Sequence, residues 1–352
     1  MGRFALRVLI TGNLGYVGPV VTRHLRATHD DLQIVGYDSD MFGYCLLRPD
    51  VPPQARVDQQ IYGDVRDFDA RLLDGVDAVV HLAAVSNDPM GDRFEEVTRA
   101  INFEASHRVA LAARDAGVGH FVFASSCSMY GAAEGGPRKE TDQLNPLTAY
   151  ARSKVATEEA LASMDLGDMV VTALRFATAC GISERLRLDL VLNDFVAGAL
   201  TSGHIEILSD GTPWRPLIDV ADMARAIDWA IGRDPEAGGQ LLRINAGSDA
   251  WNYQVKELAD AVAASIPEVS VSVNQDAAPD KRSYQVDFAR FAELAPDHQP
   301  AISLEDSIAR LSEGLRAAGF DDPAYRTSHL VRLQVLERHI EAERLDRQLR
   351  WV

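Results

Sequence analysis

The stretch "LRVLITGNLGYVGPVVTRHLRAT", residues 6–28, decides the fold class. An apolar run with the length of a buried strand breaks into a turn with glycines at positions 12, 15 and 18, and a helical pattern follows. In such a unit the first glycine allows the tight turn, the second lets the backbone approach a pyrophosphate, and the third lets the helix pack on the strand. Free amides and the positive dipole end at the start of the helix favour phosphate groups. The stretch therefore predicts a dinucleotide-binding strand–turn–helix unit.

The alternation of strand and helix patterns continues through the first half of the chain. Further apolar runs that predict strands lie at 32–38, 75–84, 120–126 and 170–177. Segments with helical periodicity lie at 94–117 and 148–164. This alternation predicts an α/β fold in which helices cover both faces of a doubly wound parallel sheet.

The pattern changes near residue 182, where short elements and loops replace the alternation. We expect a nucleotide-binding domain at 1–181 and a smaller mixed C-terminal substrate lobe at 182–352. The boundary is interleaved, because the segment 214–232 is expected to return to the first domain. The last residues, 328–352, are charged and amphipathic. We expect this tail to be a helix docked on the surface rather than a functional element.

Composition narrows the possible functions. The 352 residues carry a net charge of −17, which would repel nucleic acid and anionic membrane surfaces at long range. The sequence contains no run of 18 apolar residues and no signal-peptide pattern. Its three cysteines form neither a CxxC pair nor another metal-ligand spacing. We therefore expect a soluble, cytoplasmic protein without a metal site and without a membrane or nucleic-acid partner.

Carboxylates follow two of the predicted strands. Asp38 lies 20 residues after Gly18, at a strand end where its oxygens can accept hydrogen bonds from both ribose hydroxyls of a dinucleotide. This carboxylate would repel a 2′-phosphate, which favours NAD over NADP. Asp64, in "GDVRD", lies at another strand end and suits the adenine amino group. A turn-forming role for Asp38 and a solvated turn for Asp64 remain the alternatives.

The motif "YARSK" places Tyr150 and Lys154 four residues apart, on one face of a predicted helix. A phenol with a pKa near 10 is a poor base at neutral pH. An adjacent ammonium group and an oxidised nicotinamide would both favour the phenolate and bring the phenol into a useful range. Together with the glycine turn, the acidic strand end and "SSCSMYG" at 125–131, the pair indicates a catalytic site.

These motifs resemble the extended short-chain dehydrogenase/reductase family, specifically its nucleotide-sugar epimerases and dehydratases. From Val8 to about residue 320, the motifs fall in the family's order: "TGNLGYVG", "GDVRD", "HLAA", "SSCSMYG", "YARSK", "LRFATACG" and "WRPLIDVADMARA". The resemblance implies a Rossmann-type doubly wound sheet, NAD as the cofactor and a nucleotide-sugar substrate. It also implies a homodimer formed by the helices at 94–117 and 148–164.

The resemblance also implies roles for single residues. Ser126 would hydrogen-bond the reacting hydroxyl, Tyr150 would act as base and acid, and Lys154 would be its electrostatic and ribose-binding partner. Asn102 would support the active-site helix, and Phe176 would lie near the nicotinamide, with plain core packing as its alternative. The expected cofactor-binding residues are Gly12, Asn13, Leu14, Gly15, Tyr16, Val17, Gly18, Asp38, Asp64, Val65, Leu82, Ala83, Ala84, Asn102, Ser125, Tyr150, Lys154 and Phe176.

The residues after the catalytic serine bear on the reaction. In dehydratases of the family these two positions typically hold Asp and Glu, which protonate the leaving 6-hydroxyl and remove the proton at carbon 5. Here they are Cys127 and Ser128. A thiol and an unassisted serine hydroxyl are poor substitutes for those carboxyl groups. The pair resembles the carbon-4 epimerases and argues against 4,6-elimination.

The diphosphate of a nucleotide sugar needs cationic donors. Arg215, in "WRPLIDV", matches the family's diphosphate-binding arginine. Further candidates are Arg282 and either Arg185 or Arg187, and a solvated surface role is the alternative for each of these three. The expected substrate-binding residues are Ser86, Asn87, Ser126, Cys127, Ser128, Thr178, Asn193, Arg215 and Arg282. Two positions depart from the family pattern: Thr178 stands where Asn is usual, and Asp219 stands where His is common. The sequence alone offers no reason for Asp219.

We expect NAD-dependent epimerisation at carbon 4 of a nucleotide sugar through a transient 4-keto intermediate. A 4-ketoreductase or dehydrogenase and a 4,6-dehydratase on the same scaffold remain alternatives. A non-catalytic NAD-binding sensor is a further alternative from a different class.

Overall fold

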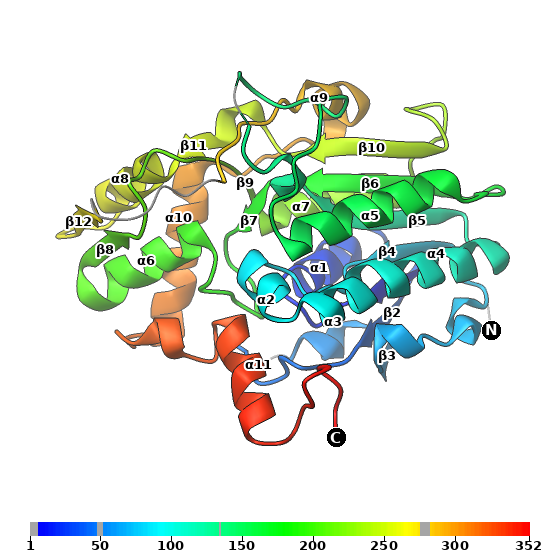
Figure 1. Cartoon of the computed structure of the whole chain (residues 1–352), viewed down its shortest axis with the longest axis horizontal. Helices are drawn as coiled ribbons and strands as arrows, with labels where there is room; N and C mark the ends of the chain where they lie inside the picture. The colour runs from blue at the N-terminus through cyan, green and yellow to red at the C-terminus, as the bar shows by residue number, and fades with distance from the viewer. Residues whose placement is uncertain (1–5, 48–51, 134, 275–281) are drawn as a thin grey trace.

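A seven-stranded parallel sheet forms the centre of the computed structural model, which describes residues 6–47, 52–133, 135–274 and 282–352 (Figure 1). In sheet order, its strands are β3 (Gln59–Tyr62), β2 (Leu32–Asp38), β1 (Leu6–Thr11), β4 (Ala78–His81), β5 (His120–Ser126), β6 (Val170–Phe176) and β10 (Leu241–Ala246). The strand order reverses between β1 and β4, and doubly wound sheets bind ligands at the carboxyl ends of the strands beside such a point. The predicted α/β fold with a Rossmann-type sheet is confirmed.

The two faces of the sheet build two separate cores. Val8 and Ile10 of β1 pack with helices α1 (Gly18–Thr28) and α7 (Val220–Ile231). Leu9, between them, points to the opposite face, where α4 (Ser106–Asp115) and α5 (Ala149–Ser163) lie. Figure 1 shows α4 and α5 in front of the sheet and α1 behind it. Strand β6 is buried along its whole length, which explains its largely apolar sequence, and its one charged residue, Arg175, pairs with buried Glu158 at 2.7 Å.

The segment 94–117 differs from the single regular helix that its periodicity predicts. It consists of α3 (Glu95–Arg99), a π-helical turn at Ala100–Ala105, and α4. The turn contains buried Asn102, whose Oδ1 accepts from the Val85 amide at 2.8 Å and whose Nδ2 donates to the Val85 carbonyl at 3.0 Å. Such turns interrupt helices where a side chain serves a neighbouring segment, and apolar periodicity does not reveal them.

The second lobe contains two small sheets and several helices. One sheet holds β7 (Thr178–Cys180), β9 (Trp214–Asp219) and β11 (Asn252–Gln254), and the other holds β8 (His204–Ile207) and β12 (Ser270–Val273). The remaining helices are α2 (Asp88–Arg93), α6 (Val191–Ser202), α8 (Val255–Ser265), α9 (Ala289–Leu294), α10 (Leu304–Ala317) and α11 (Arg332–Glu341). The chain returns to the first domain with α7 and again with β10, which pairs with β6 and lies beyond the expected return segment 214–232.

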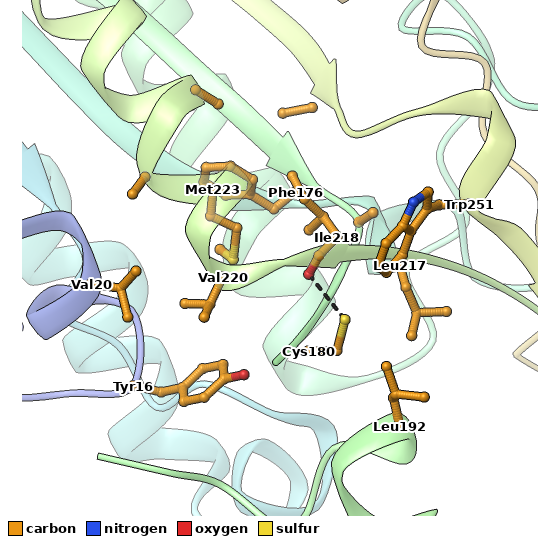
Figure 2. Packing of buried hydrophobic residues seen from close by; sticks show 14 of the residues in the cluster. Tyr16, Val20, Phe176, Cys180, Leu192, Leu217, Ile218, Val220, Met223 and Trp251 are labelled. Carbon is orange, nitrogen blue, oxygen red and sulfur yellow. Dashed lines mark hydrogen bonds between the residues drawn. The ribbon is translucent and has the colours of Figure 1, made fainter. Parts of the chain in front are cut away.

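The joint between the lobes lies beside the glycine turn. The Tyr16 hydroxyl donates to the Gly181 carbonyl at 2.6 Å, and the Cys180 thiol donates to the Ile218 carbonyl at 3.4 Å. Figure 2 shows Tyr16, Cys180 and Leu192 among the buried apolar side chains at this joint. The second lobe is therefore packed directly on the turn that follows β1. Within the described ranges, no helix is long and apolar enough to cross a membrane.

Candidate active site

A cavity of about 830 Å³ opens at the carboxyl ends of the central strands and extends between the lobes. Of the residues expected to bind cofactor or substrate, most line this cavity: Gly12, Gly15, Tyr16, Val17, Asp38, Asp64, Val65, Leu82, Ala83, Ala84, Ser86, Asn87, Ser125, Ser126, Ser128, Tyr150, Lys154, Phe176, Thr178, Arg215 and Arg282. The fold thus brings together segments that lie far apart in the sequence.

The glycine turn forms one end of the cavity. Gly12 has φ +72°, and a Cβ there would lie 2.6 Å from the Ala83 nitrogen. The backbone of the turn therefore lies so close to the backbone after β4 that no side chain fits between them. A Cβ on Gly18 would lie 2.2 Å from the Asn13 carbonyl oxygen. Only glycine fits at these two positions, and the backbone between them faces the cavity at Gly15. The cradle fits the pyrophosphate of NAD at the start of α1.

Two carboxylates mark the next part of the cavity wall. Asp38 Oδ2 accepts from the Leu14 amide at 3.0 Å, and Oδ1 accepts from the Asp40 amide at 2.8 Å. Burial raises the pKa of Asp38, and the two backbone hydrogen bonds oppose that shift. Asp64 accepts from Arg66 Nε at 2.9 and 3.0 Å. The pair fits the ribose and adenine of NAD, and Asp38 would repel a 2′-phosphate.

The same cavity holds the residues predicted to be catalytic, Ser126, Tyr150 and Lys154. Helix α5 begins where Thr148 Oγ1 accepts from the Ala151 amide at 3.2 Å, and this cap places Tyr150 in the first turn. One turn later, Lys154 is 3% exposed, and its Nζ donates to the Ala124 carbonyl at 2.6 Å. That nitrogen lies 5.6 Å from the centre of the Tyr150 ring.

Burial shifts both titratable groups toward their neutral forms. It raises the pKa of Tyr150 to about 12, while a hydrogen bond with Ser126 and the nearby charge of Arg187 oppose the shift. It lowers the pKa of Lys154 to about 7, and the carboxylate of Glu158 opposes that shift. The arrangement can move a proton to and from a substrate hydroxyl, provided that a further positive charge favours the phenolate.

Six expected site residues lie off the cavity wall, as the described part of the chain shows: Asn13, Leu14, Gly18, Asn102, Cys127 and Asn193. The most consequential is Cys127, whose side chain is 0% exposed and donates to the Arg175 carbonyl at 3.1 Å. Burial raises the pKa of this thiol. The Cys127 side chain, expected on the substrate side, therefore points into the core and not into the cavity, because the tight turn after β5 directs it inward.

Asn193 and Asn102 position neighbouring segments instead. Asn193 Oδ1 accepts from the Gly181 amide at 2.9 Å, and its Nδ2 donates to the Arg187 carbonyl at 2.8 Å. Asn102 Nδ2 also donates to Ser153 Oγ at 3.1 Å, which ties the π-helical turn to α5. Both side chains shape the cavity from behind its wall.

The structure distinguishes Arg185 from Arg187, the two arginines between which the sequence could not choose a candidate for the diphosphate site. Arg187 lines the cavity, where it forms a two-pronged ion pair with Asp189 (3.0 and 2.8 Å) and donates to Ser86 Oγ at 3.0 Å. Arg185 instead donates to the Phe42 carbonyl, outside the cavity wall. The alternating charges of "SERLRLD" gave no indication of which arginine faces inward, or that Asp189 would join it.

The arginines expected to hold the diphosphate lie on the second-lobe side of the cavity. Arg282 pairs with Asp88 at 2.8 Å, and Asp88 in turn accepts from Thr148 Oγ1 at 2.7 Å. Arg215 lies on strand β9 and donates to the Trp214 carbonyl at 2.8 Å. Asp88 was not among the expected residues, although it connects the substrate side to the start of α5.

The structure explains Asp219. Its Oδ1 accepts from the Ala221 amide at 2.8 Å and caps α7, while its Oδ2 accepts from Ser307 Oγ at 2.6 Å. A Cβ on Gly181 would lie 2.3 Å from the same carboxylate. The aspartate is therefore a buried helix cap that joins α7 to α10.

The C-terminal tail also reaches the cavity, contrary to the expectation of a surface helix without function. Val331, Arg332, Leu336 and Leu349 line it. Helix α11 forms where the tail was predicted to be helical, but the amphipathic pattern did not show that the tail lines the cavity.

A dinucleotide cradle, an acidic strand end and a Tyr–Lys pair around one cavity define an enzyme of the short-chain dehydrogenase/reductase type. The family model described as "NAD dependent epimerase/dehydratase family" matches residues 8–247. The chain belongs to this family. The predicted family and its cofactor, NAD, are confirmed.

Individual relatives agree with this result. The UDP-glucose 4-epimerase of Streptomyces lividans is 30% identical over 284 residues, which cover 73% of this chain and 80% of that protein. A structure of MoeE5 in complex with UDP-glucuronic acid and NAD is 27% identical with a TM-score of 0.73, covering 89% of this chain and 99% of that one. TunA, an NAD-dependent NDP-hexosamine 5,6-dehydratase, has a TM-score of 0.77 over 90% of this chain and 100% of its own. At 24% identity, TunA shares the fold only.

Proposed function

We propose that the protein interconverts the carbon-4 epimers of a nucleotide sugar, with NAD regenerated in each turnover. The observation that carries the proposal is the position of Ser126, Tyr150 and Lys154 at one end of the NAD cavity, beside Cys127 and Ser128. The Cys127 side chain is buried, and Ser128 offers only a hydroxyl group. Neither can replace the carboxyl groups that an elimination at carbons 5 and 6 needs.

Bound NAD supplies a reversible acceptor for the hydride at carbon 4. Tyr150, as the phenolate, takes the proton of the 4-hydroxyl, and Ser126 hydrogen-bonds the same oxygen. Lys154 and Arg187 stabilise the negative charge of the phenolate. Arg215 and Arg282 would hold the diphosphate while the 4-keto sugar turns about its bond to it. The hydride taken from carbon 4 would then return to the other face of that carbon, and Tyr150 would return the proton to the 4-oxygen.

The experiment incubates purified, NAD-loaded protein with UDP-, dTDP-, GDP- and ADP-sugars in deuterium oxide and identifies the products by NMR. We expect inversion at carbon 4 without deuterium at carbons 3 or 5, and no product from Tyr150→Phe. Deuterium at carbon 5 with loss of the 6-hydroxyl would establish a dehydratase instead. Net consumption of NADH on a 4-keto sugar would establish a reductase, and bound NAD without any turnover would favour a sensor.

The proposal includes a homodimer in the cytoplasm. Half-buried Leu111 on α4 and Val155 on α5 support an interface through these two helices. The three cysteines are buried and unpaired, which suits a reducing compartment. Sedimentation analysis tests the dimer, and Leu111→Glu should produce monomers.

A further inference from the structure

The residues after α11, which we call the C-terminal strap (342–352), return to the carboxyl ends of β2 and β3. In Figure 1 this red segment lies against the blue N-terminal part of the chain. A short backbone pairing between Leu345 and Trp351 folds the strap on itself, and Leu345 and Leu349 are buried in it. The strap is therefore an ordered part of the molecule.

Arg66 connects the strap to the cofactor site. Its Nε binds the carboxylate of Asp64 at 2.9 and 3.0 Å. Its Nη1 donates to the Gln348 carbonyl at 2.6 Å, and its Nη2 donates to the Leu349 carbonyl at 3.1 Å. One buried guanidinium thus holds a cavity-lining carboxylate and two strap carbonyls at the same time.

A second set of contacts joins the tail to the segment after β2. Trp351 Nε1 donates to the Ser39 carbonyl at 2.7 Å, and His339 Nε2 lies 3.0 Å from the Met41 carbonyl oxygen. The Arg332 guanidinium lies 4.6 Å from the centre of the Phe42 ring. Ser39, Met41 and Phe42 all line the cavity next to Asp38.

We propose that the C-terminal strap is a wall of the NAD site, in which Leu349 supports the residues around the adenosine half of the cofactor from behind and the strap retains NAD between turnovers. Leu349 is 0% exposed and reaches the cavity wall beside Asp64 and Val65, the residues that fit the adenine end. The inference needs only the family's cofactor and not the proposed reaction. It agrees with that reaction, because an enzyme that returns its hydride to the product has no need to exchange cofactor.

The experiment measures exchange of bound NAD for radiolabelled NAD in the full-length protein. Leu349 has φ +54°, a conformation that Asn tolerates, so Leu349→Asn removes the apolar contact without a new backbone conflict. Trp351→Ala removes an anchor that does not line the cavity. We expect both variants to exchange NAD at least about tenfold faster, which corresponds to roughly 1.4 kcal/mol. Arg347→Ala, an exposed residue of the same strap, should exchange like the wild type.

Thermal melting of each variant without cofactor separates this effect from unfolding. If Trp351→Ala melts early, it is replaced by Trp351→Phe, which keeps an aromatic ring but lacks the hydrogen-bond donor. Exchange at the wild-type rate in folded Leu349→Asn would overturn the proposal. If the wild type exchanges NAD slowly, Leu349→Asn exchanges it faster and neither converts a nucleotide sugar, the strap is upheld and the epimerase is refuted. If the wild type epimerises a nucleotide sugar but already exchanges NAD as fast as Leu349→Asn, only the strap is refuted.

Discussion

At the residue scale, the cavity favours the neutral forms of the two groups that would share a proton. Burial raises the pKa of Tyr150 and lowers the pKa of Lys154, while Arg187 and Glu158 act in the opposite direction. Two nearly neutral groups cost less to bury than two charges. The positive nicotinamide of bound NAD would then shift Tyr150 toward the phenolate. The reactive form is therefore favoured when the cofactor is in place.

The buried amine of Lys154 should reduce stability. Its pKa is about 7 in the folded protein and 10.5 in its ordinary state, so the unfolded chain binds more protons between these values and stability rises with pH across that window. Lys154→Met should abolish activity yet stabilise the protein at pH 6 by about 1 kcal/mol or more. Urea unfolding at pH 6 and pH 9 measures this, and the gain should shrink at pH 9. A variant that is less stable than the wild type at pH 6 would contradict the argument.

Arg187 should tune Tyr150. Removing this cation in Arg187→Gln raises the pKa of the phenol, so the rising, acidic limb of the pH profile of kcat/KM should move to higher pH by roughly one unit. Arg187→Lys keeps the charge and should keep the limb near its wild-type position. A merely structural role would lower the rate at every pH and leave the limb unmoved.

At the element scale, the start of α5 determines where Tyr150 lies. Thr148 accepts a hydrogen bond from the helix and donates one to Asp88, which also pairs with Arg282 from the second lobe. The cap thus links the catalytic helix to the substrate side of the cavity. A change at Thr148 should affect both helix stability and substrate handling.

Thr148→Ala should cost about 1 kcal/mol of unfolding free energy, because it removes the cap. It should also lower kcat several-fold by releasing the Asp88 contact, which denaturant unfolding and steady-state kinetics would show together. Thr148→Ser keeps the hydroxyl and should restore both quantities. Loss of stability with wild-type kcat would mean that the Asp88 contact is unimportant for the reaction.

The glycine turn offers a matched pair of variants. Gly12 and Gly117 have almost the same positive φ, +72° and +74°, but a Cβ at Gly12 would strike the Ala83 backbone, whereas a Cβ at Gly117 meets nothing within 4 Å. Gly117→Ala should cost about 1–2 kcal/mol from the backbone conformation alone and leave NAD binding intact. Gly12→Ala should cost more and abolish NAD binding in a calorimetric titration. If Gly12→Ala and Gly117→Ala changed the unfolding free energy and NAD binding equally, the close approach of Gly12 to Ala83 would be unimportant.

At the scale of the whole molecule, the sequence predicts what depends on local patterns. Strand–helix alternation, the glycine spacing and the Tyr–Lys spacing are local, and they predicted the sheet, the NAD cradle and the position of Tyr150. The π-helical turn at 100–105 goes with the hydrogen bonds of Asn102 to Val85, a contact between separate segments that the helical pattern did not reveal. The assignment of β10 to the sheet depends on pairing with β6, a long-range contact.

The parts of the site that the sequence missed are also long-range. Which of Arg187 and Arg185 faces the cavity depends on how their loop packs on the other lobe, and Arg185 is buried against the segment after β2. The burial of Cys127 depends on the turn after β5. Leu349 enters a cavity that begins at Gly12, and amphipathicity in the tail shows only that one side is buried. Such details follow from how the lobes and tail pack, and not from the spacing of residues.

The bonds from Arg66 to the strap join residues 282 and 283 positions apart in the chain. Because the rest of the chain is already folded, only the conformational entropy of the strap itself opposes these bonds, and the strap buries few apolar side chains in return. Segments of this kind unfold locally at a free energy below that of global unfolding. If cofactor leaves only after such local unfolding, its release should accelerate with urea along a shallow slope, set by the surface of one short segment rather than by that of the entire protein.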